Sequence, residues 1–175
     1  MFRFIQGILK VFLRLIFRIK IHGRENCPNE GAVIVAINHK SFWDAVLIAG
    51  FMPRQLTFMA KKELFDVPLL GAIIQWAGAF PVARGTGDIG AIKAALSALK
   101  AGKALGIFPE GTRIKGNQPH SAKAGVAFIA EKTGAPILPV AIRGGYRIFS
   151  KIDLFIEAPV YVKSEDGKRL SSEQL

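Results

Sequence analysis

The chain has 175 residues, half of them hydrophobic, which is enough to bury a core and too apolar for an intrinsically disordered protein. Its formal net charge of +11 indicates an anionic partner, which could be nucleic acid, a phospholipid surface or a phosphorylated substrate. Cys27 is the single cysteine, so an intrachain disulfide is excluded.

Residues 1–20 are predicted to form one amphipathic helix. At about 100° per residue, one arc of this helix carries its polar side chains, which are Arg3, Gln6, Lys10, Arg14 and Arg18. A wide apolar face beside a basic stripe is typical of a helix that lies in the headgroup plane of a membrane. The alternative is a helix that packs on its own core or on a partner. Interspersed charges argue against a secretory signal.

Beyond this helix, strand and helix patterns alternate. Short apolar runs predict strands at 32–37, which is rich in Val and Ile, and at 56–60, 79–82, 104–108, 136–142 and 154–162. Helices are predicted at 42–51, 69–77, 88–100 and 123–132, and the segment 88–100 has apolar residues at helical spacing. This alternation predicts an α/β fold with a central, largely parallel β-sheet flanked by helices. Residues 67–83 are the best candidate for a membrane span, but this segment is too short to cross a bilayer and contains prolines. Residues 163–175 are polar and are predicted to be frayed.

A polar cluster follows the strand predicted at 32–37. It contains His39 and Asp44, and the exposed end of a buried strand is where α/β proteins place their chemistry. These two side chains can meet only if the segment is a loop that turns into a helix. A histidine held by a carboxylate could then take a proton from a hydroxyl that the substrate brings. The alternative is structural, because Ser41 and Asp44 have the spacing of a capping box and His39 could be a surface histidine.

A second cluster suits a phosphate group. The strand at 104–108 runs into Pro109–Arg113, where Gly111 permits backbone amides to converge and Thr112 and Arg113 offer a hydroxyl and a guanidinium. Other cations follow predicted strands or begin a helix, namely Lys61, Lys62, Arg84 and Lys123. Since the ends of parallel strands meet along one edge of a sheet, these cations are predicted to lie beside His39. Each of them alone could equally be a solvated surface charge.

These motifs resemble the conserved blocks of the 1-acyl-sn-glycerol-3-phosphate acyltransferases, within the glycerolipid acyltransferase superfamily. The family block N-H-x-x-x-x-D matches Asn38–Asp44, and F-P-E-G-T-R matches Phe108–Arg113 without a change. A further block ends at Arg84, although Ala83 stands where family members often have an acidic residue, and the last is a proline-containing strand at 137–142. The chain is therefore predicted to comprise an amphipathic membrane-association helix at 1–20, from its periodicity, and an acyltransferase domain at 21–175, from the resemblance.

The resemblance also implies a reaction. His39 would deprotonate the sn-2 hydroxyl of lysophosphatidic acid while Asp44 orients the ring, and the alkoxide would attack the thioester of acyl-CoA or acyl-carrier protein to give phosphatidic acid. The family positions tied to acceptor binding are Arg84, Glu110, Gly111 and Arg113. Further binding residues, assigned from charge and placement, are Thr112, Lys61, Lys62 and Lys123. No cofactor is expected, and no metal ligand is assigned.

Two alternatives remain at this point. One is the same chemistry on another lysophospholipid or on glycerol 3-phosphate, and the other is a non-catalytic membrane-binding module in which His39 and Asp44 would be dispensable. We expect no nucleic-acid partner, because no aromatic–basic signature accompanies the net charge. We expect a peripheral or monotopic protein on the cytoplasmic face of the cell membrane, acting in phospholipid biosynthesis. His22, His120 and Cys27 are predicted to be structural.

Overall fold

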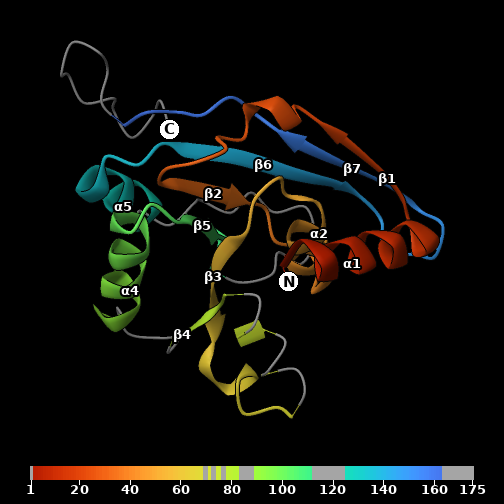
Figure 1. Ribbon diagram of the computed structural model, residues 1–175, viewed down its shortest axis with the longest axis horizontal. Coiled ribbons are helices and arrows are strands. Elements are labelled where there is room, and N and C mark those ends of the chain that lie inside the picture. Colours follow the sequence, from red (N-terminus) through yellow and green to blue (C-terminus); the bar gives the residue numbers. More distant parts are fainter. Residues whose placement is uncertain are drawn as a thin grey trace.

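The computed structural model describes residues 2–68, 71, 74–75, 78–82, 89–111 and 125–162. Within those residues, seven strands form one sheet in the order β1-β7-β6-β2-β5-β3-β4, with helices packed against it (Figure 1). Neighbouring strands pair in parallel except β6 and β7, which are antiparallel. The predicted α/β fold with a largely parallel sheet is therefore confirmed.

The bounds of most elements agree with the sequence prediction to within one or two residues. The strands are β1 (Arg18–His22), β2 (Val33–Ile37), β3 (Leu56–Lys61), β4 (Phe80–Val82), β5 (Ala104–Ile107), β6 (Ile137–Gly144) and β7 (Lys151–Ile156). The helices are α1 (Phe2–Ile16), α2 (Trp43–Phe51), α4 (Ile89–Lys100) and α5 (Gly125–Thr133), with short 3-10 turns η1 (Arg24–Asn26) and η2 (Lys62–Leu64). Much of the helix predicted at 69–77, and all of the frayed segment predicted at 163–175, lie outside the described residues.

Two predicted elements are wrong in extent. The helix predicted over 1–20 ends at Ile16, and Arg18–His22 is instead a strand that pairs in parallel with β7. Exposed and half-buried side chains alternate along β1, which is the period of a strand. The strand predicted at 154–162 begins at Lys151 and ends at Ile156. Beyond it lies Pro159, which cannot donate to a ladder, and Val160 forms only an isolated bridge.

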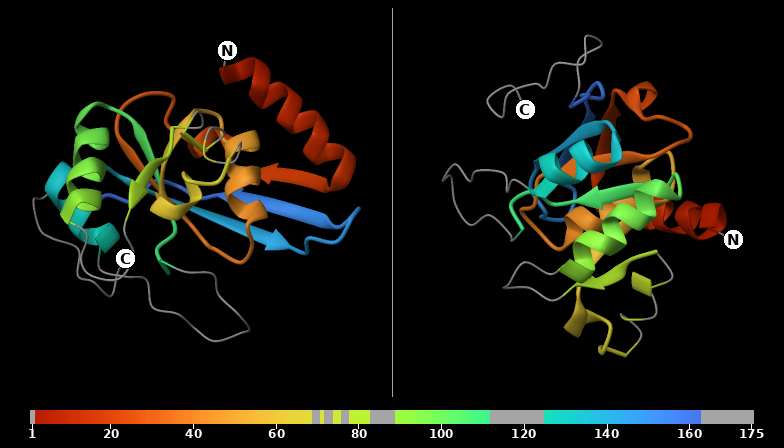
Figure 2. Two further views of the ribbon diagram at one scale, coloured as in Figure 1. Left: turned by 90° about the horizontal axis from the view of Figure 1, so that it is seen from below. Right: turned by 90° about the vertical axis from the view of Figure 1, so that its left-hand side faces the viewer.

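Apolar clusters cover both faces of the sheet, and the alternation of side chains along β2 separates them. Val33, Val35 and Ile37 belong to the cluster that includes α1 and α2, whereas Ile34 belongs to the cluster that includes α4 and α5. Figure 2 shows α1 and α4 toward opposite ends of the sheet. Among the described residues, no helix has the length and apolar character that a bilayer crossing requires.

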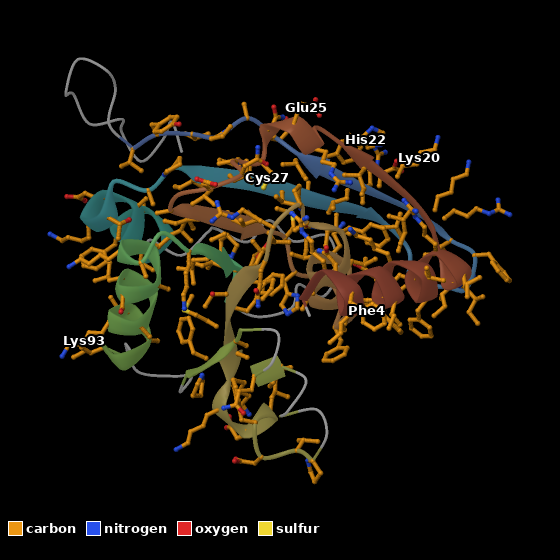
Figure 3. The ribbon with its side chains drawn as sticks, viewed as in Figure 1. Phe4, Lys20, His22, Glu25, Cys27 and Lys93 are labelled. Carbon is orange, nitrogen blue, oxygen red and sulfur yellow. The ribbon has the colours of Figure 1, made fainter. Side chains whose placement is uncertain are left out.

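Helix α1 buries one side and exposes the other. Leu13 is fully buried against α2, and the Gln6 side chain, predicted on the polar arc, is buried too and donates hydrogen bonds to the carbonyls of Ala49 and Met52 at 3.2 and 3.0 Å. The opposite side exposes large apolar side chains, namely Phe4, Ile8, Val11, Phe12 and Leu15. Figure 3 shows Phe4 projecting away from the sheet. The helix therefore packs on its own core and still presents an apolar face to its surroundings.

Candidate active site

His39 and Asp44 meet where β2 gives way to α2. The chain leaves β2 at Ile37, turns, and enters α2 at Trp43, so that Asp44 stands in the first turn of the helix. Nδ1 of His39 lies 3.0 Å from Oδ2 of Asp44, and the two side chains are 12% and 1% exposed. The predicted meeting through a loop that turns into a helix is confirmed.

The carboxylate of Asp44 also holds the turn itself. Its Oδ2 accepts the backbone N–H groups of Lys40 and Ser41, each at 2.6 Å, and its Oδ1 accepts the hydroxyl of Tyr146. The bond from Ser41 is half of the reciprocal pattern of a capping box, but the N-cap residue is Phe42 and its side chain makes no cap hydrogen bond. The structural and the catalytic interpretations of Asp44 are therefore compatible, since one carboxylate can serve both.

These contacts determine the ionisation of Asp44. Burial acts to raise its pKa, but hydrogen bonds from His39, Ser41, Tyr146 and Lys40 together hold the pKa below its ordinary value. The carboxyl group is therefore ionised at neutral pH. Burial and the neighbouring carboxylate raise the pKa of Tyr146, so its hydroxyl remains a donor. A carboxylate at Nδ1 favours the tautomer with hydrogen on Nδ1, which leaves Nε2 of His39 as the basic nitrogen.

The turn after β5 reaches the same place. Strands β2 and β5 pair in parallel with Ala36 opposite Ile107, so the segments that follow them are neighbours. The ring of Phe108 stacks on the His39 imidazole, with centroids 4.0 Å apart and planes at 24°. The N–H of Gly111 donates to the carbonyl of Phe108 at 2.9 Å, and Gly111 has a φ of 67°, which favours glycine. The start of the second cluster thus lies beside His39, as predicted from a parallel sheet.

Asn38, the first residue of the N-H-x-x-x-x-D block, extends the ladder between β2 and β6. Its Nδ2 donates to the carbonyl of Ile142 at 3.1 Å, and its Oδ1 accepts the N–H of the same residue at 2.7 Å. The amide side chain thus takes the place of a peptide group at the end of β2. This fixes the point at which the chain leaves the sheet, and hence the position of His39.

The predicted substrate-binding residues are only partly described. Arg84, Thr112, Arg113 and Lys123 lie outside the described residues. Glu110 is half-buried, and among the described residues no partner bonds its Oε2.

The predicted lysines lie farther along the sheet. Lys61 ends β3 and Lys62 begins η2, and β3 is two positions from β2 in the order of strands, or about 10 Å at ordinary strand spacing. Lys61 forms an exposed ion pair with Glu63 at 3.0 Å. That these lysines contact substrate remains a prediction.

Tyr146 is a residue of the site that was not predicted from the sequence. This residue lies in the loop between β6 and β7 and reaches Asp44 across 102 residues of sequence. The available signal was its place two residues after β6, directly behind Gly144 and Gly145, at the sheet edge that also holds the end of β2. A tyrosine at such an edge can bring a hydroxyl to the site.

The acyltransferase family model matches residues 18–143, which run from the start of β1 to the last residue but one of β6 and contain both members of the His39–Asp44 pair. The chain belongs to the acyltransferase family. This acyltransferase is 35% identical to the 1-acyl-sn-glycerol-3-phosphate acyltransferase of Bacillus subtilis, over 92% of this chain and 83% of that protein. It is 33% identical to the enzyme of the same name from Streptococcus pneumoniae, over 87% of this chain and 58% of that protein.

The fold agrees with a solved structure from the same family. The crystal structure of PlsC, the 1-acyl-sn-glycerophosphate (LPA) acyltransferase of Thermotoga maritima, superposes with a TM-score of 0.77 at 29% sequence identity. The match covers 99% of this chain and 74% of that one. The resemblance recognised in the sequence motifs is confirmed, and the acyltransferase is an O-acyltransferase.

Proposed function

We propose that this acyltransferase transfers an acyl chain from acyl-CoA or acyl-carrier protein to the sn-2 hydroxyl of 1-acyl-sn-glycerol-3-phosphate. The product would be phosphatidic acid, made for phospholipid biosynthesis. The observation that carries the proposal is the buried His39–Asp44 pair, with Nδ1 and Oδ2 at 3.0 Å and Nε2 left as the base. The choice of acceptor follows the names of the relatives from Bacillus subtilis and Streptococcus pneumoniae.

The reaction needs no protein nucleophile. Nε2 of His39 takes the proton of the sn-2 hydroxyl as its oxygen attacks the thioester carbonyl. Asp44, ionised and bonded to Nδ1, stabilises the imidazolium that forms. The tetrahedral intermediate then collapses, the carbon–sulfur bond breaks, and His39 returns its proton to the departing thiolate. The stack with Phe108 restricts the imidazole during both proton transfers.

The acceptor phosphate is proposed to bind at the turn that begins with Phe108. This turn lies directly against His39, so a headgroup held there would bring its hydroxyl near Nε2. The conformation of Gly111 allows a close backbone approach. Guanidinium groups bind phosphate with two parallel hydrogen bonds. The residues proposed to contact the acceptor are Arg84, Glu110, Gly111, Thr112, Arg113, Lys61, Lys62 and Lys123.

Helix α1 is proposed to hold the enzyme on an anionic membrane surface, as a peripheral or monotopic protein on the cytoplasmic face, while the chain from β1 onward forms the acyltransferase domain. The exposed face formed by Phe4, Ile8, Val11, Phe12 and Leu15 supports this, together with Arg3 beside it. Apolar side chains at such a boundary add burial, and each nearby cation contributes about 1 kcal/mol on an anionic surface.

Liposome flotation tests the membrane contact. Ile8→Glu with Phe12→Glu should abolish binding to anionic vesicles, because both side chains lie on the exposed face of α1. Ile89→Glu is the matched control, since Ile89 is 67% exposed on a different helix. High salt should only weaken binding of the unaltered protein, because apolar insertion is not screened. Undiminished flotation of the double variant would move the contact away from α1.

The reaction is tested with purified protein, lysophosphatidic acid and a labelled acyl thioester. His39→Ala should slow product formation by roughly 10²–10⁴-fold, the usual contribution of a general base. The chain contains a matched control, because His22 is also paired with an aspartate, at 2.8 Å from Asp153, but on the exposed outer strand (Figure 3). His22→Ala should leave turnover unchanged. Near-normal turnover of folded His39→Ala would refute the mechanism. The acceptor is identified separately, by comparing turnover of a panel of lysophospholipids and glycerol 3-phosphate with one acyl donor.

A further inference from the structure

The loop between β6 and β7 touches both the catalytic pair and the end of helix α1. Its far end is fastened to the junction of α1 and β1, where the N–H of Phe149 donates to the carbonyl of Ile16 at 2.6 Å and the N–H of Arg18 donates to the carbonyl of Ser150 at 2.9 Å. Figures 1 and 2 show this loop beside the C-terminal end of α1. The loop is therefore held by β6, which ends at Gly144, before Tyr146, and by this junction after it.

Tyr146 is held in the loop by its ring as well as by its hydroxyl. The ring meets Phe17 edge to face, with centroids 6.2 Å apart and planes at 86°. Phe17 is 2% exposed and makes a second such contact with Trp43, at 5.6 Å, next to Asp44 in sequence. The ring packing leaves the hydroxyl of Tyr146 directed at Oδ1 of Asp44.

The remaining contacts of Asp44 fall on its other oxygen. His39, Lys40 and Ser41 all bond Oδ2. A carboxylate fixed at one oxygen can still turn about its Cβ–Cγ bond, whose torsion is soft. The bond from Tyr146 to Oδ1 fixes the plane of the carboxylate and satisfies an oxygen of a side chain that is only 1% exposed.

We infer that Tyr146 is a positioning residue of the catalytic pair, which orients Asp44 through Oδ1 so that Oδ2 stays aligned with Nδ1 of His39. The inference rests on the proposed role of His39 as the base. Tyr146 acts on the reaction only through Asp44. Its hydroxyl affects the rate of proton transfer, whereas its ring supports the packing around Phe17.

Tyr146→Phe separates these two roles, because it keeps the ring and removes the hydroxyl. A monomeric short-chain acceptor keeps membrane binding out of the measurement. A hydrogen bond to a charged group corresponds to about a tenfold to hundredfold change in rate, so kcat should fall by that factor while both KM values stay within about twofold. Tyr161→Phe removes the same hydroxyl from a side chain that is 58% exposed, and should match the unaltered protein.

The pH dependence of unfolding provides a readout that packing alone would not move. Among the residues that the structure describes, the titratable side chains that bond Asp44 are His39 and Tyr146. The hydroxyl of Tyr146 is one of the groups that lower the pKa of Asp44. Its removal should therefore bring the folded-state pKa of Asp44 closer to its ordinary value, so that the stability contributed by ionised Asp44 is lost at a higher pH in urea unfolding. An unmoved pH dependence of unfolding together with an unchanged kcat would overturn the inference.

A double-variant comparison tests whether Tyr146 works through Asp44. In an Asp44→Ala background, Tyr146→Phe should change kcat by no more than about twofold, because the group that it positions has been removed. Equal losses in both backgrounds would show an independent role and overturn the inference. Circular dichroism melting confirms that each variant is folded. Unchanged turnover of His39→Ala would refute the proposed function. If His39→Ala were inactive and Tyr146→Phe fully active, only the positioning role of Tyr146 would be refuted.

Discussion

Replacing Asp44 with asparagine keeps the shape of the side chain, removes its charge, and has a predictable outcome in this site. The oxygen of the amide can occupy the place of Oδ2, where it still accepts from His39, Lys40 and Ser41. The NH₂ group then faces Tyr146, whose hydroxyl can rotate and accept instead of donating. Because every buried polar atom keeps a partner in this arrangement, Asp44→Asn should fold.

The losses of stability and activity in Asp44→Asn can be gauged from the negative charge that the amide lacks. A charge-assisted hydrogen bond is about twice as strong as a neutral one, but the variant also avoids burying a charge, so the loss of unfolding free energy at neutral pH should be about 1–3 kcal/mol. The loss of activity should be larger, because the imidazolium that forms on His39 would have no neighbouring carboxylate. Since His39 can keep hydrogen on Nδ1, we expect kcat to fall by roughly 10²–10³-fold. This loss is smaller than in a site where the amide forces the histidine into the wrong tautomer.

Acidification should narrow the difference in stability between the two proteins. The pKa of Asp44 is lowered in the folded protein, so its stabilising contribution is complete above the unfolded-state pKa of about 3.9 and is lost as the pH falls through the folded-state value. Asparagine does not titrate there. Urea unfolding at several pH values should show a constant difference above about pH 5 and a shrinking one below about pH 4. A difference that widens in acid, or near-normal kcat, would refute the reasoning.

Other substitutions have equally definite outcomes. Asn38→Ala removes both side-chain hydrogen bonds to Ile142 and should lower the unfolding free energy in urea by about 1–3 kcal/mol, together with turnover. Gly106→Ala would place a methyl group closer to the Phe58 ring than van der Waals contact allows, and should cost about 1–3 kcal/mol by the same assay. Arg113→Ala should raise the KM for lysophosphatidic acid about ten- to hundredfold with a smaller change in the KM for the donor, whereas the opposite pattern would assign this arginine to the donor.

The sequence could predict the features of the site that depend on local order. His39 and Asp44 are close along the chain, and the strand before them and the helix after them both have clear apolar patterns, so their meeting follows from the turn between those elements. The convergence of Phe108 on His39 follows in turn from parallel pairing, which brings the ends of β2 and β5 together.

The features that were missed depend on contacts distant in sequence. Tyr146 reaches Asp44 across 102 residues, and Asn38 reaches Ile142 across 104. The spacing of apolar residues along one segment cannot predict a contact between residues so far apart in the sequence. The error at β1 has a similar origin, because Arg18 continues the polar arc of the helix while the strand depends on pairing with Lys151 and its successors in β7. Tertiary pairing overrode the helical pattern at this position.

The early end of helix α1 has a consequence for the proposed reaction at a membrane. Only Phe17 separates the last residue of α1 from the first residue of β1, so its side chain is held at a junction fixed by the helix on one side and the sheet on the other. There it packs on Tyr146, which bonds Asp44, and on Trp43, which precedes Asp44. The C-terminal end of α1 thus runs directly into the aromatic cluster of Phe17, Trp43 and Tyr146, which also contacts or adjoins Asp44 of the catalytic pair. If α1 lies in the membrane boundary as proposed, this packing sets the height at which His39 meets a lipid acceptor.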